Sequence, residues 1–331
     1  MAQVVLVACV VNVISGASVR LTESGLGCAD WPTCTKSSVT PPLSFHPIME
    51  FTNRMVVTLL VIAVVVAFGA SFLRREKRMD LSVLSGSLLL GVLAEAGVGA
   101  LVVYSKLNPY VVMAHFLVGM ALVTLSLVLA IQSGRARVPG TLKTSLRVRR
   151  LARVMMAVLV VVLAAGTATT GAGPHAGGPG AKRIPVPLAD MARTHSSIVL
   201  VLGALLLIEL WLLQKDGAPP SVVRRGQALL AVMVAQGLVG YTQYFSQEPA
   251  FLVGIHVAGA LSVLLTMLWF YDGMYHHPAE ALSDEPAGAP STLRQHSPAL
   301  SGIGSDSLAL KASGEREGAV GQAPGLVEAK P

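Results

Sequence analysis

Apolar residues gather in long runs along most of the chain, and short polar or charged segments separate these runs. Each run approaches the roughly 20 residues that a helix needs to cross a bilayer. The pattern predicts spans near residues 2–19, 52–73, 82–104, 110–131, 151–170, 190–213, 226–244 and 251–272. We therefore expect an all-α integral membrane protein with eight transmembrane helices.

An internal duplication without gaps organises these helices. Glu95–His115 reads EAGVGALVVYSKLNPYVVMAH, and Gln236–His256 reads QGLVGYTQYFSQEPAFLVGIH. Each copy predicts an apolar helix, a short turn and a second apolar helix with one histidine about two turns in. Because an even number of spans separates the copies, the duplication predicts two parallel-repeat four-helix bundles.

The same pattern predicts how the chain is divided. The expected segments are an N-terminal four-helix half (1–132), a basic linker (133–150), a C-terminal four-helix half (151–272) and a tail (273–331). The tail is rich in Pro, Gly, Ala, Ser and charge and lacks apolar periodicity, which predicts a disordered cytoplasmic segment. Its histidines, His276, His277 and His296, are expected to be solvated.

Composition agrees with a membrane protein. Of 331 residues, 53% are hydrophobic and only 13% are charged, and the mean hydropathy is +0.64, whereas a soluble domain carries about 25% charged residues. The net charge of +7 is not a nucleic-acid footprint, because the basic residues form short clusters between apolar runs. We expect no nucleic-acid partner.

These basic clusters predict the topology. They follow the second, fourth and sixth spans, and comprise Arg74, Arg75, Lys77, Arg78, Arg135, Arg137, Lys143, Arg147, Arg149, Arg150, Lys215, Arg224 and Arg225. The positive-inside rule then places both termini in the cytoplasm of a plasma-membrane protein. Loops 20–50, 105–109, 171–189 and 245–250 are expected to face outward.

The first span has a second interpretation. Met1–Ile14 is followed by Ser15-Gly16-Ala17, which is compatible with a signal peptide and a small-residue cleavage site. The stretch lacks the basic segment with which such peptides begin, so we expect a transmembrane helix. Whether Met1 is the true start stays open.

Histidines in apolar helices are the first candidates for chemistry. His115 and His256 each lie about six residues inside an outer helix end, and His195 lies at similar depth in the sixth span. Asn53 occupies the equivalent place in the second span. A single such histidine is more often structural, but a facing pair inside a four-helix bundle is how two axial ligands hold a haem. Copper or zinc is the alternative, although further Cys or carboxylate ligands are lacking.

Two acidic residues accompany these positions. Glu50 lies three residues before Asn53 on the same helix face, where it could accept a proton, orient a substrate or simply pair with Arg54. Glu95 lies well inside the third span, opposite the neutral Gln236 of the other copy. It is a second candidate, or a residue that only hydrogen-bonds within the bundle.

The first outer loop carries two cysteines, Cys28 and Cys34, six residues apart. Outside the cytoplasm a disulfide can form and persist. It would be a structural staple or, alternatively, a dithiol that takes electrons from the site below it. Cys9 lies in an apolar run and is expected to be inert packing.

The other long outer loop, GTATTGAGPHAGG at 166–178, takes the place in the second half that 16–28 takes in the first. Its glycines permit tight turns and a close approach to a ligand. His175 could bond a haem propionate or be solvated. Arg20, Lys182 and Arg183 could pair with propionates or with lipid phosphates.

Together these features resemble the haem A synthase family. The matching words are GASVRLTESGLGCADWPTC (16–34), EFTNR (50–54), NPYVVMAH (108–115), TGAGPHAG (170–177), His195 and His256, and they cover about residues 5–272 in order. The resemblance implies an oxidoreductase that converts the C8 methyl of haem O to a formyl group, giving haem A for cytochrome oxidase. It also implies an eight-helix fold built by duplication.

The resemblance implies a role for each site residue. His195 and His256 would hold a haem b cofactor, with the iron between them. His115 would bind the iron of the substrate haem in the other half. Asn53 and Arg54 would line that substrate pocket. Glu50 would lie close to the chemistry, and Cys28 and Cys34 would form a disulfide in the outer loop.

The sequence departs from the family pattern at two places. Many relatives have histidine where Asn53 stands, and Gly178 stands where an acidic residue is expected. Two other functions are weighed against the enzyme. A di-haem cytochrome b that only carries electrons predicts paired histidines in both halves, against Asn53. A haem-binding assembly factor without chemistry gives Glu50 no task.

The expected partners follow from the enzyme. They are haem O and haem A, the farnesyltransferase that produces haem O, a membrane electron acceptor and membrane lipids. A homo-oligomer is also possible.

Overall fold

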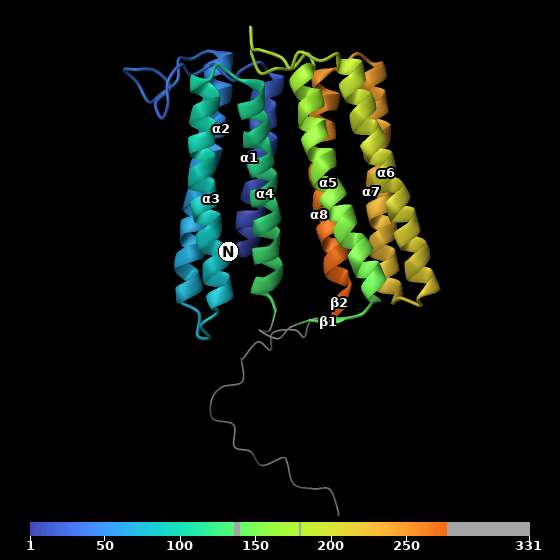
Figure 1. Cartoon of the computed structure of the whole chain (residues 1–331). Helices are drawn as coiled ribbons and strands as arrows, with labels where there is room; N and C mark the ends of the chain where they lie inside the picture. Colours follow the sequence, from blue (N-terminus) through green and yellow to red (C-terminus); the bar gives the residue numbers. More distant parts are fainter. Residues whose placement is uncertain (136–139, 179, 277–331) are drawn as a thin grey trace, which may run out of the picture. The chain divides into compact units, whose positions relative to one another are not determined.

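The computed structural model of the chain describes residues 1–135, 140–178 and 180–276. In these residues, eight long helices run between loops at two ends (Figure 1). They are α1 (Ala2–Leu21), α2 (Phe45–Phe72), α3 (Met79–Tyr104), α4 (Pro109–Ser133), α5 (Leu146–Ala172), α6 (Leu188–Lys215), α7 (Pro220–Phe245) and α8 (Ala250–Gly273). All eight are long and apolar enough to cross a membrane. The predicted all-α integral membrane fold is confirmed.

Several helices begin earlier than the apolar runs predict. α2 begins at Phe45, where the run predicts 52, α5 at Leu146, where it predicts 151, and α7 at Pro220, where it predicts 226. The added turns carry polar and charged residues, which hydropathy excludes from a span. A helix satisfies its own main-chain hydrogen bonds, so it can continue beyond the apolar layer. The basic linker is correspondingly shorter than predicted.

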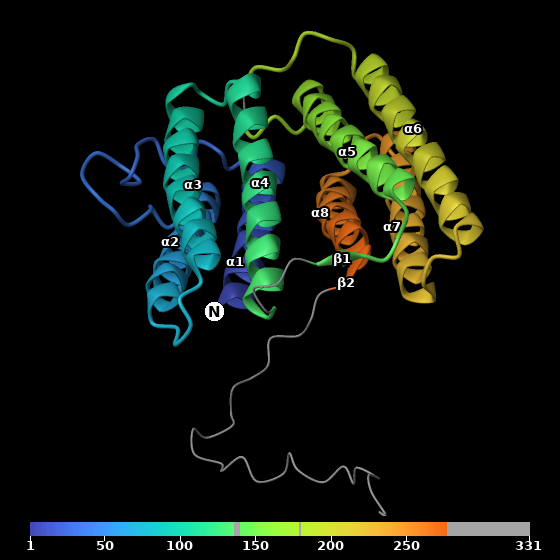
Figure 2. The ribbon, with the colours of Figure 1, turned by 60° about the horizontal axis from the view of Figure 1, so that its bottom comes forward.

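The helices lie in two groups, α1–α4 and α5–α8, in both views of the ribbon (Figures 1 and 2). Apolar side chains of both groups are fully buried between helices, among them Val64, Leu88 and Phe270. Others point away from the helices, such as Leu90, which is 71% exposed. An exposed apolar surface of this kind suits contact with lipid chains.

The two copies of the duplicated stretch fold alike. α3 and α7 end at aligned positions, and α4 and α8 begin at aligned positions. In the turns between them, Lys106 and Leu107 have φ angles of 53° and 60°, and Gln247 and Glu248 have 63° and 60°. These are left-handed conformations, which residues other than glycine seldom adopt. The sequence alignment without gaps therefore corresponds to the same backbone in both copies.

The end of the helices that carries Cys28 and Cys34 is called here the disulfide end, and the opposite end the linker end. At the linker end, Arg135 donates two hydrogen bonds of 2.7 Å to Asp272, which joins the end of α4 to that of α8. Strand β1 (Thr141–Leu142) pairs with the antiparallel strand β2 (Tyr275–His276). Residues 273–276, predicted as the start of the tail, are therefore ordered against the linker.

The rest of the predicted tail lies outside the described residues. This holds for His277 and His296. His276 belongs to β2 and is exposed, as expected for a solvated histidine.

Asp216, which follows α6, anchors the beginning of α5. The hydroxyl of Ser145 donates to it at 2.6 Å, and the guanidinium of Arg147 donates to both of its oxygens. Arg147, together with the Ser145 hydroxyl, lowers the pKa of Asp216 to about 2. Since the pKa is lowered, this contact is present at neutral pH and is lost only as the pH falls towards 2.

Candidate functional site

A cavity of about 1050 Å³ lies among the helices, and side chains of all eight line it. Ligand pockets in proteins measure roughly 300–1,000 Å³, so this one has room for a large ligand. The predicted site residues in its wall are Glu50, Asn53, Arg54, His115, His195 and His256. The structure thus brings together, around one space, all of the predicted site residues except the two cysteines.

His195 on α6 and His256 on α8 face each other across part of this cavity. Their ring centroids are 6.4 Å apart, with 74° between the ring planes. A metal–imidazole bond is about 2 Å long and the ring centroid lies roughly 1 Å behind the bonded nitrogen, so two imidazoles on one iron have centroids about 6 Å apart. The spacing of the two centroids is therefore compatible with two histidine ligands on one iron.

Each of the four aligned positions faces a glycine on the preceding helix. A Cβ atom built on that glycine would lie close to the opposing side chain, in the pairs Gly166–His195 (3.0 Å), Gly240–His256 (3.0 Å), Gly99–His115 (3.4 Å) and Gly16–Asn53 (3.9 Å). Because glycine has no side chain, each imidazole or amide can pack directly against the backbone of the preceding helix. Asn53 is thus seated like the three histidines.

These glycines give a test of the His195–His256 pair. In Gly240→Ala the new methyl would lie 3.0 Å from Cε1 of His256, so the ring must move. Overpacking of this kind costs about 1–3 kcal/mol, and we expect haem affinity to fall about 10- to 100-fold. Haem titration of the purified protein measures it. Gly97→Ala is the control, because a Cβ there meets nothing within 4 Å; equal affinities in the two variants would contradict the expectation.

The His115 position differs from the His195–His256 pair. Nδ1 of His115 lies 3.0 Å from Oε1 of Glu95, close enough for an ion pair but not aligned as a hydrogen bond. Asn53 also lines the cavity, and its buried Oδ1 has no hydrogen-bond partner among the described residues. An amide is a poor ligand for haem iron, so this half offers one strong nitrogen ligand at that depth.

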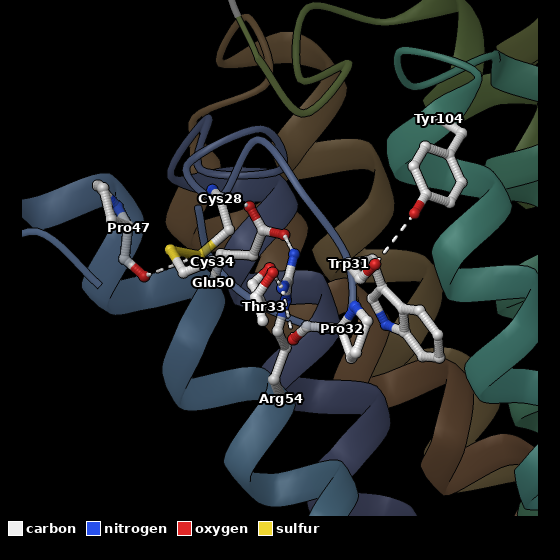
Figure 3. A network of polar contacts seen from close by, with 9 residues as sticks. All are labelled: Cys28, Trp31, Pro32, Thr33, Cys34, Pro47, Glu50, Arg54 and Tyr104. Atoms are coloured by element: carbon white, nitrogen blue, oxygen red, sulfur yellow. Dashed lines mark hydrogen bonds and ion pairs between the residues drawn. A yellow bond between two sulfur atoms is a disulfide. The ribbon is translucent and has the colours of Figure 1, made fainter. Parts of the chain in front are cut away.

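Glu50 lies beneath the outer loop, and its carboxylate holds that loop (Figure 3). The residue is only 5% exposed. Its Oε2 accepts a hydrogen bond of 2.7 Å from the main-chain N–H of Cys28, and its Oε1 accepts one of 2.6 Å from Arg54. The ion pair considered for Glu50 and Arg54 is confirmed, and it is buried between the loop and α2.

The loop above Glu50 contains a disulfide between Cys28 and Cys34, as the resemblance implies. Arg54 also donates to the carbonyls of Pro32 at 3.3 Å and Thr33 at 2.8 Å, and the Tyr104 hydroxyl donates to the carbonyl of Trp31 at 3.0 Å (Figure 3). Side chains from α2 and α3 therefore fasten the segment between the two cysteines.

Gly27, next to the disulfide, is packed against the main chain of α2. A Cβ at this position would clash with the carbonyl oxygen of His46 and would lie 2.7 Å from the nitrogen of Pro47. Main-chain atoms cannot yield as a flexible side chain does, so Gly27→Ala must push the loop away from α2. We expect the Tm in detergent to fall by several degrees, at a cost of about 1–3 kcal/mol. Gly69→Ala, in open space on α2, is the control; a Tm no lower than the control's would contradict this packing.

The second outer loop, between α5 and α6, makes side-chain contacts at the disulfide end with both groups of helices. Arg20, at the end of α1, donates to the carbonyls of His175 at 2.8 Å and Thr170 at 2.9 Å. Nε2 of His175 lies 2.7 Å from the carbonyl oxygen of Glu248. Arg20 and His175, considered as partners of haem propionates, line the cavity. In the structure, Arg20 bonds carbonyls at the end of α5 and in this loop, and His175 contacts the carbonyl of Glu248 in the turn between α7 and α8.

Two polar residues inside helices were missed by the sequence reasoning. Asn12 on α1 lines the cavity, and its buried Oδ1 has no hydrogen-bond partner in the described part of the chain. Glu209 on α6 is 0% exposed, and neither carboxylate oxygen has a partner there. A single polar residue within an apolar run was the available signal for both. Cys9 is buried and free, as expected of packing.

The donor set of the cavity is compatible with a haem. Among the described residues, no group of three or more His, Cys, Asp or Glu side chains is arranged to hold a metal ion. A haem needs only axial ligands from the protein, because the porphyrin supplies the other four. Eight apolar helices around a cavity lined by histidines define a polytopic membrane protein with internal space for a large ligand.

Comparison with known proteins agrees with this class. Residues 1–47 and 43–177 match the profile of the cytochrome oxidase assembly protein family. The chain belongs to this family.

Individual relatives carry the name heme A synthase. The chain is 36% identical over 131 residues to one from Geobacillus thermodenitrificans, covering 39% of the chain and 41% of the relative. The match to one from Geobacillus kaustophilus is also 36% over 131 residues, covering 38% and 40%. One from Lysinibacillus sphaericus is 26% identical over 117 residues, covering 35% and 38%. The matches span about two fifths of the length of these relatives.

Proposed function

We propose that this protein is a haem A synthase, an oxidoreductase that converts the C8 methyl of haem O to a formyl group and so makes haem A for cytochrome oxidase. The observation that carries the proposal is a difference between the two halves that line one cavity: one half places two histidines there, and the other places a histidine and an asparagine. The ring centroids of His195 and His256 are 6.4 Å apart, which is compatible with two ligands on one iron, whereas the candidate residues of the other half are His115 and Asn53. The relatives named heme A synthase support the same activity.

In this proposal, residues 151–272 form the cofactor half. His195 and His256 would hold haem b, and Gly166 and Gly240 leave the space in which their rings are seated. A bis-histidine haem, when bound, accepts and passes on single electrons. Two strong ligands suit permanent retention, because neither axial site is left for exchange. The electrons removed from the substrate would leave this half for a membrane electron acceptor.

Residues 1–132 form the substrate half. His115 would bind the iron of haem O, and Asn53 would line the pocket without competing as a strong ligand. One strong bond instead of two suits a molecule that must enter, react and leave. Glu50 and Arg54 lie in the wall of the same cavity. Each oxygen of the Glu50 carboxylate already accepts one hydrogen bond and can accept another, so Glu50 can still orient the substrate or take up a proton.

The Cys28–Cys34 disulfide is proposed to be a staple of this half. Its loop is held by Glu50, Arg54 and Tyr104 from two helices. A staple of this kind keeps the loop over the cavity and keeps Glu50 in place below it. The alternative, a dithiol that exchanges electrons with the site, predicts that replacing both cysteines stops the reaction even when the loop remains folded.

The location and partners belong to the same proposal. The basic clusters at the linker end favour a plasma-membrane protein with that end and both termini in the cytoplasm. The disulfide end then faces outward, where the Cys28–Cys34 bond persists. Haem O would come from the farnesyltransferase that produces it, in the same membrane. Residues 133–150 would join the halves, and assembly as a homo-oligomer is compatible with this arrangement.

Pigment extraction tests the proposed function. The chain is expressed in a host that makes haem O but no haem A, and the extracted haems are separated and identified by mass and absorption spectrum. A formyl haem at the position of haem A is expected. Haem b alone in the purified protein, with haem O unchanged, would instead indicate a di-haem cytochrome b. Bound but unaltered haem O would indicate an assembly factor without chemistry.

A further inference from the structure

Glu95 is a buried carboxyl group that the proposed reaction does not yet use. It lies on α3, is 7% exposed and lines the cavity. Its Oε1 lies 3.0 Å from Nδ1 of His115 on α4. Its Oε2 is buried without a hydrogen-bond partner among the described residues. A carboxyl group is costly to bury unless a partner compensates it, and the imidazole is the group next to it.

The other copy of the duplication uses the same position differently. Gln236 aligns with Glu95, and its Nε2 donates to the main-chain carbonyl of His256 at 2.8 Å. A Cβ atom on Gly259 would clash with Oε1 of Gln236, so the amide is packed against the backbone of α8. Nδ1 of His256 has no hydrogen-bond partner among the described residues. The Gln236 amide thus hydrogen-bonds a main-chain carbonyl, whereas the Glu95 carboxyl group lies next to a ring nitrogen of His115.

We propose, on the basis of the function above, that Glu95 is a positioning residue for His115. Oε1 accepts a hydrogen bond from Nδ1–H of the imidazole, which fixes the tautomer and directs Nε2 to the iron of the substrate haem. A histidine that ligates a metal commonly donates its second N–H to a carboxylate, and this contact orients the ring and makes the ligating nitrogen a stronger donor. In the structure Nδ1 and Oε1 are 3.0 Å apart but are not aligned as a hydrogen bond, so the proposed contact requires the imidazole ring to turn.

This contact separates the two haem sites chemically. The substrate iron would have a single histidine made more basic by a carboxylate, with the Asn53 amide on the other side. The cofactor iron would have two histidines without such a carboxylate. Strengthening the one bond compensates for the missing second ligand, so the substrate is held in one orientation while its opposite face stays accessible.

Haem binding and vibrational spectroscopy test the role of Glu95. Wild type, Glu95→Gln and Glu95→Leu are purified in detergent and titrated with ferric haem b as the probe. The part of the haem titration that disappears in His115→Ala is called the His115-dependent phase. Loss of a supporting carboxylate typically weakens metal binding about 10- to 100-fold, so we expect the haem affinity of this phase to fall by that factor. In the reduced protein, resonance Raman should show the iron–histidine stretching band at its highest frequency in wild type, lower with glutamine and lowest with leucine.

Two controls make the result specific. Glu209→Gln makes the same chemical change in a fully buried glutamate that does not line the cavity, and it should leave the His115-dependent phase unchanged. The low-spin signal of the His195–His256 haem in each sample shows that the variant is folded. Unchanged affinity and an unchanged band in both Glu95 variants, with the His115-dependent phase lost in His115→Ala, would overturn the role of Glu95 alone. A phase that persists in His115→Ala would overturn the proposed substrate site as well.

Discussion

Replacing His115 by alanine is expected to abolish haem A formation while the protein stays folded and keeps its second haem. His115 is the one histidine at this depth in the half formed by α1–α4, and it faces the cavity together with Asn53 and Glu50. In the proposed substrate site, the iron of haem O would then have no strong protein ligand, and the C8 methyl would no longer be held in a fixed place. Misplacement of a reacting group by about 1 Å already costs roughly 100-fold in rate. Haem extraction from cells with matched protein levels measures the loss.

Asn53→His is the informative partner of this variant. Asn53 is seated against Gly16 as the histidines are seated against their glycines, so the larger ring has a place. We expect haem A formation to continue, with tighter substrate binding and slower release. Normal haem A formation in His115→Ala would reject the proposed substrate site. Complete loss of haem A in Asn53→His, at equal protein level, would contradict this expectation.

Replacing His256 by alanine is expected to remove the resident haem b and its low-spin spectrum. The ring centroid of His256 lies 6.4 Å from that of His195, and its removal would leave the proposed haem b with one histidine ligand. In the proposed function, electrons taken from the substrate leave through this haem, so we expect little or no haem A. Absorption and electron paramagnetic resonance spectra of the purified protein report the change directly, independently of activity.

His195→Ala should behave in the same way, because the two rings act as one site. Free imidazole, added during purification, can enter the space left by either ring and should restore part of the low-spin signal. A normal low-spin spectrum in both alanine variants would contradict the assignment of this pair. Loss of the spectrum without loss of haem A would place the electron path elsewhere in the molecule.

The number of helices and the depth of the histidines followed from the sequence, whereas the helix ends did not. Hydropathy detects only the apolar layer, so the turns at Phe45, Leu146 and Pro220 were missed. The duplication without gaps aligned the turns of both copies because neither copy carries an insertion. Ordering of residues 273–276 by the short strand β1 was invisible, because two paired residues leave no pattern in a sequence.

The residue types of the site were predictable, but most of their contacts were not. Glu50 could be paired with Arg54 from their spacing on one helix. Its second partner, the N–H of Cys28, lies 22 residues away in an irregular loop. The glycines behind the imidazoles, and the approach of Glu95 to His115, depend on how neighbouring helices rotate about their axes. Hydropathy leaves that rotation undetermined wherever a helix is apolar all round.

Loops usually tolerate insertions, but the left-handed turns between α3 and α4 and between α7 and α8 make loop length critical. Lys106 and Leu107, like Gln247 and Glu248, adopt a conformation that costs about 1–2 kcal/mol per residue. The turn sets the angular phase of the second helix relative to the first. One inserted residue would rotate the following helix by about 100° and swing its histidine out of the cavity. The length and the left-handed conformation of these two turns therefore fix the rotation of α4 and α8 about their axes.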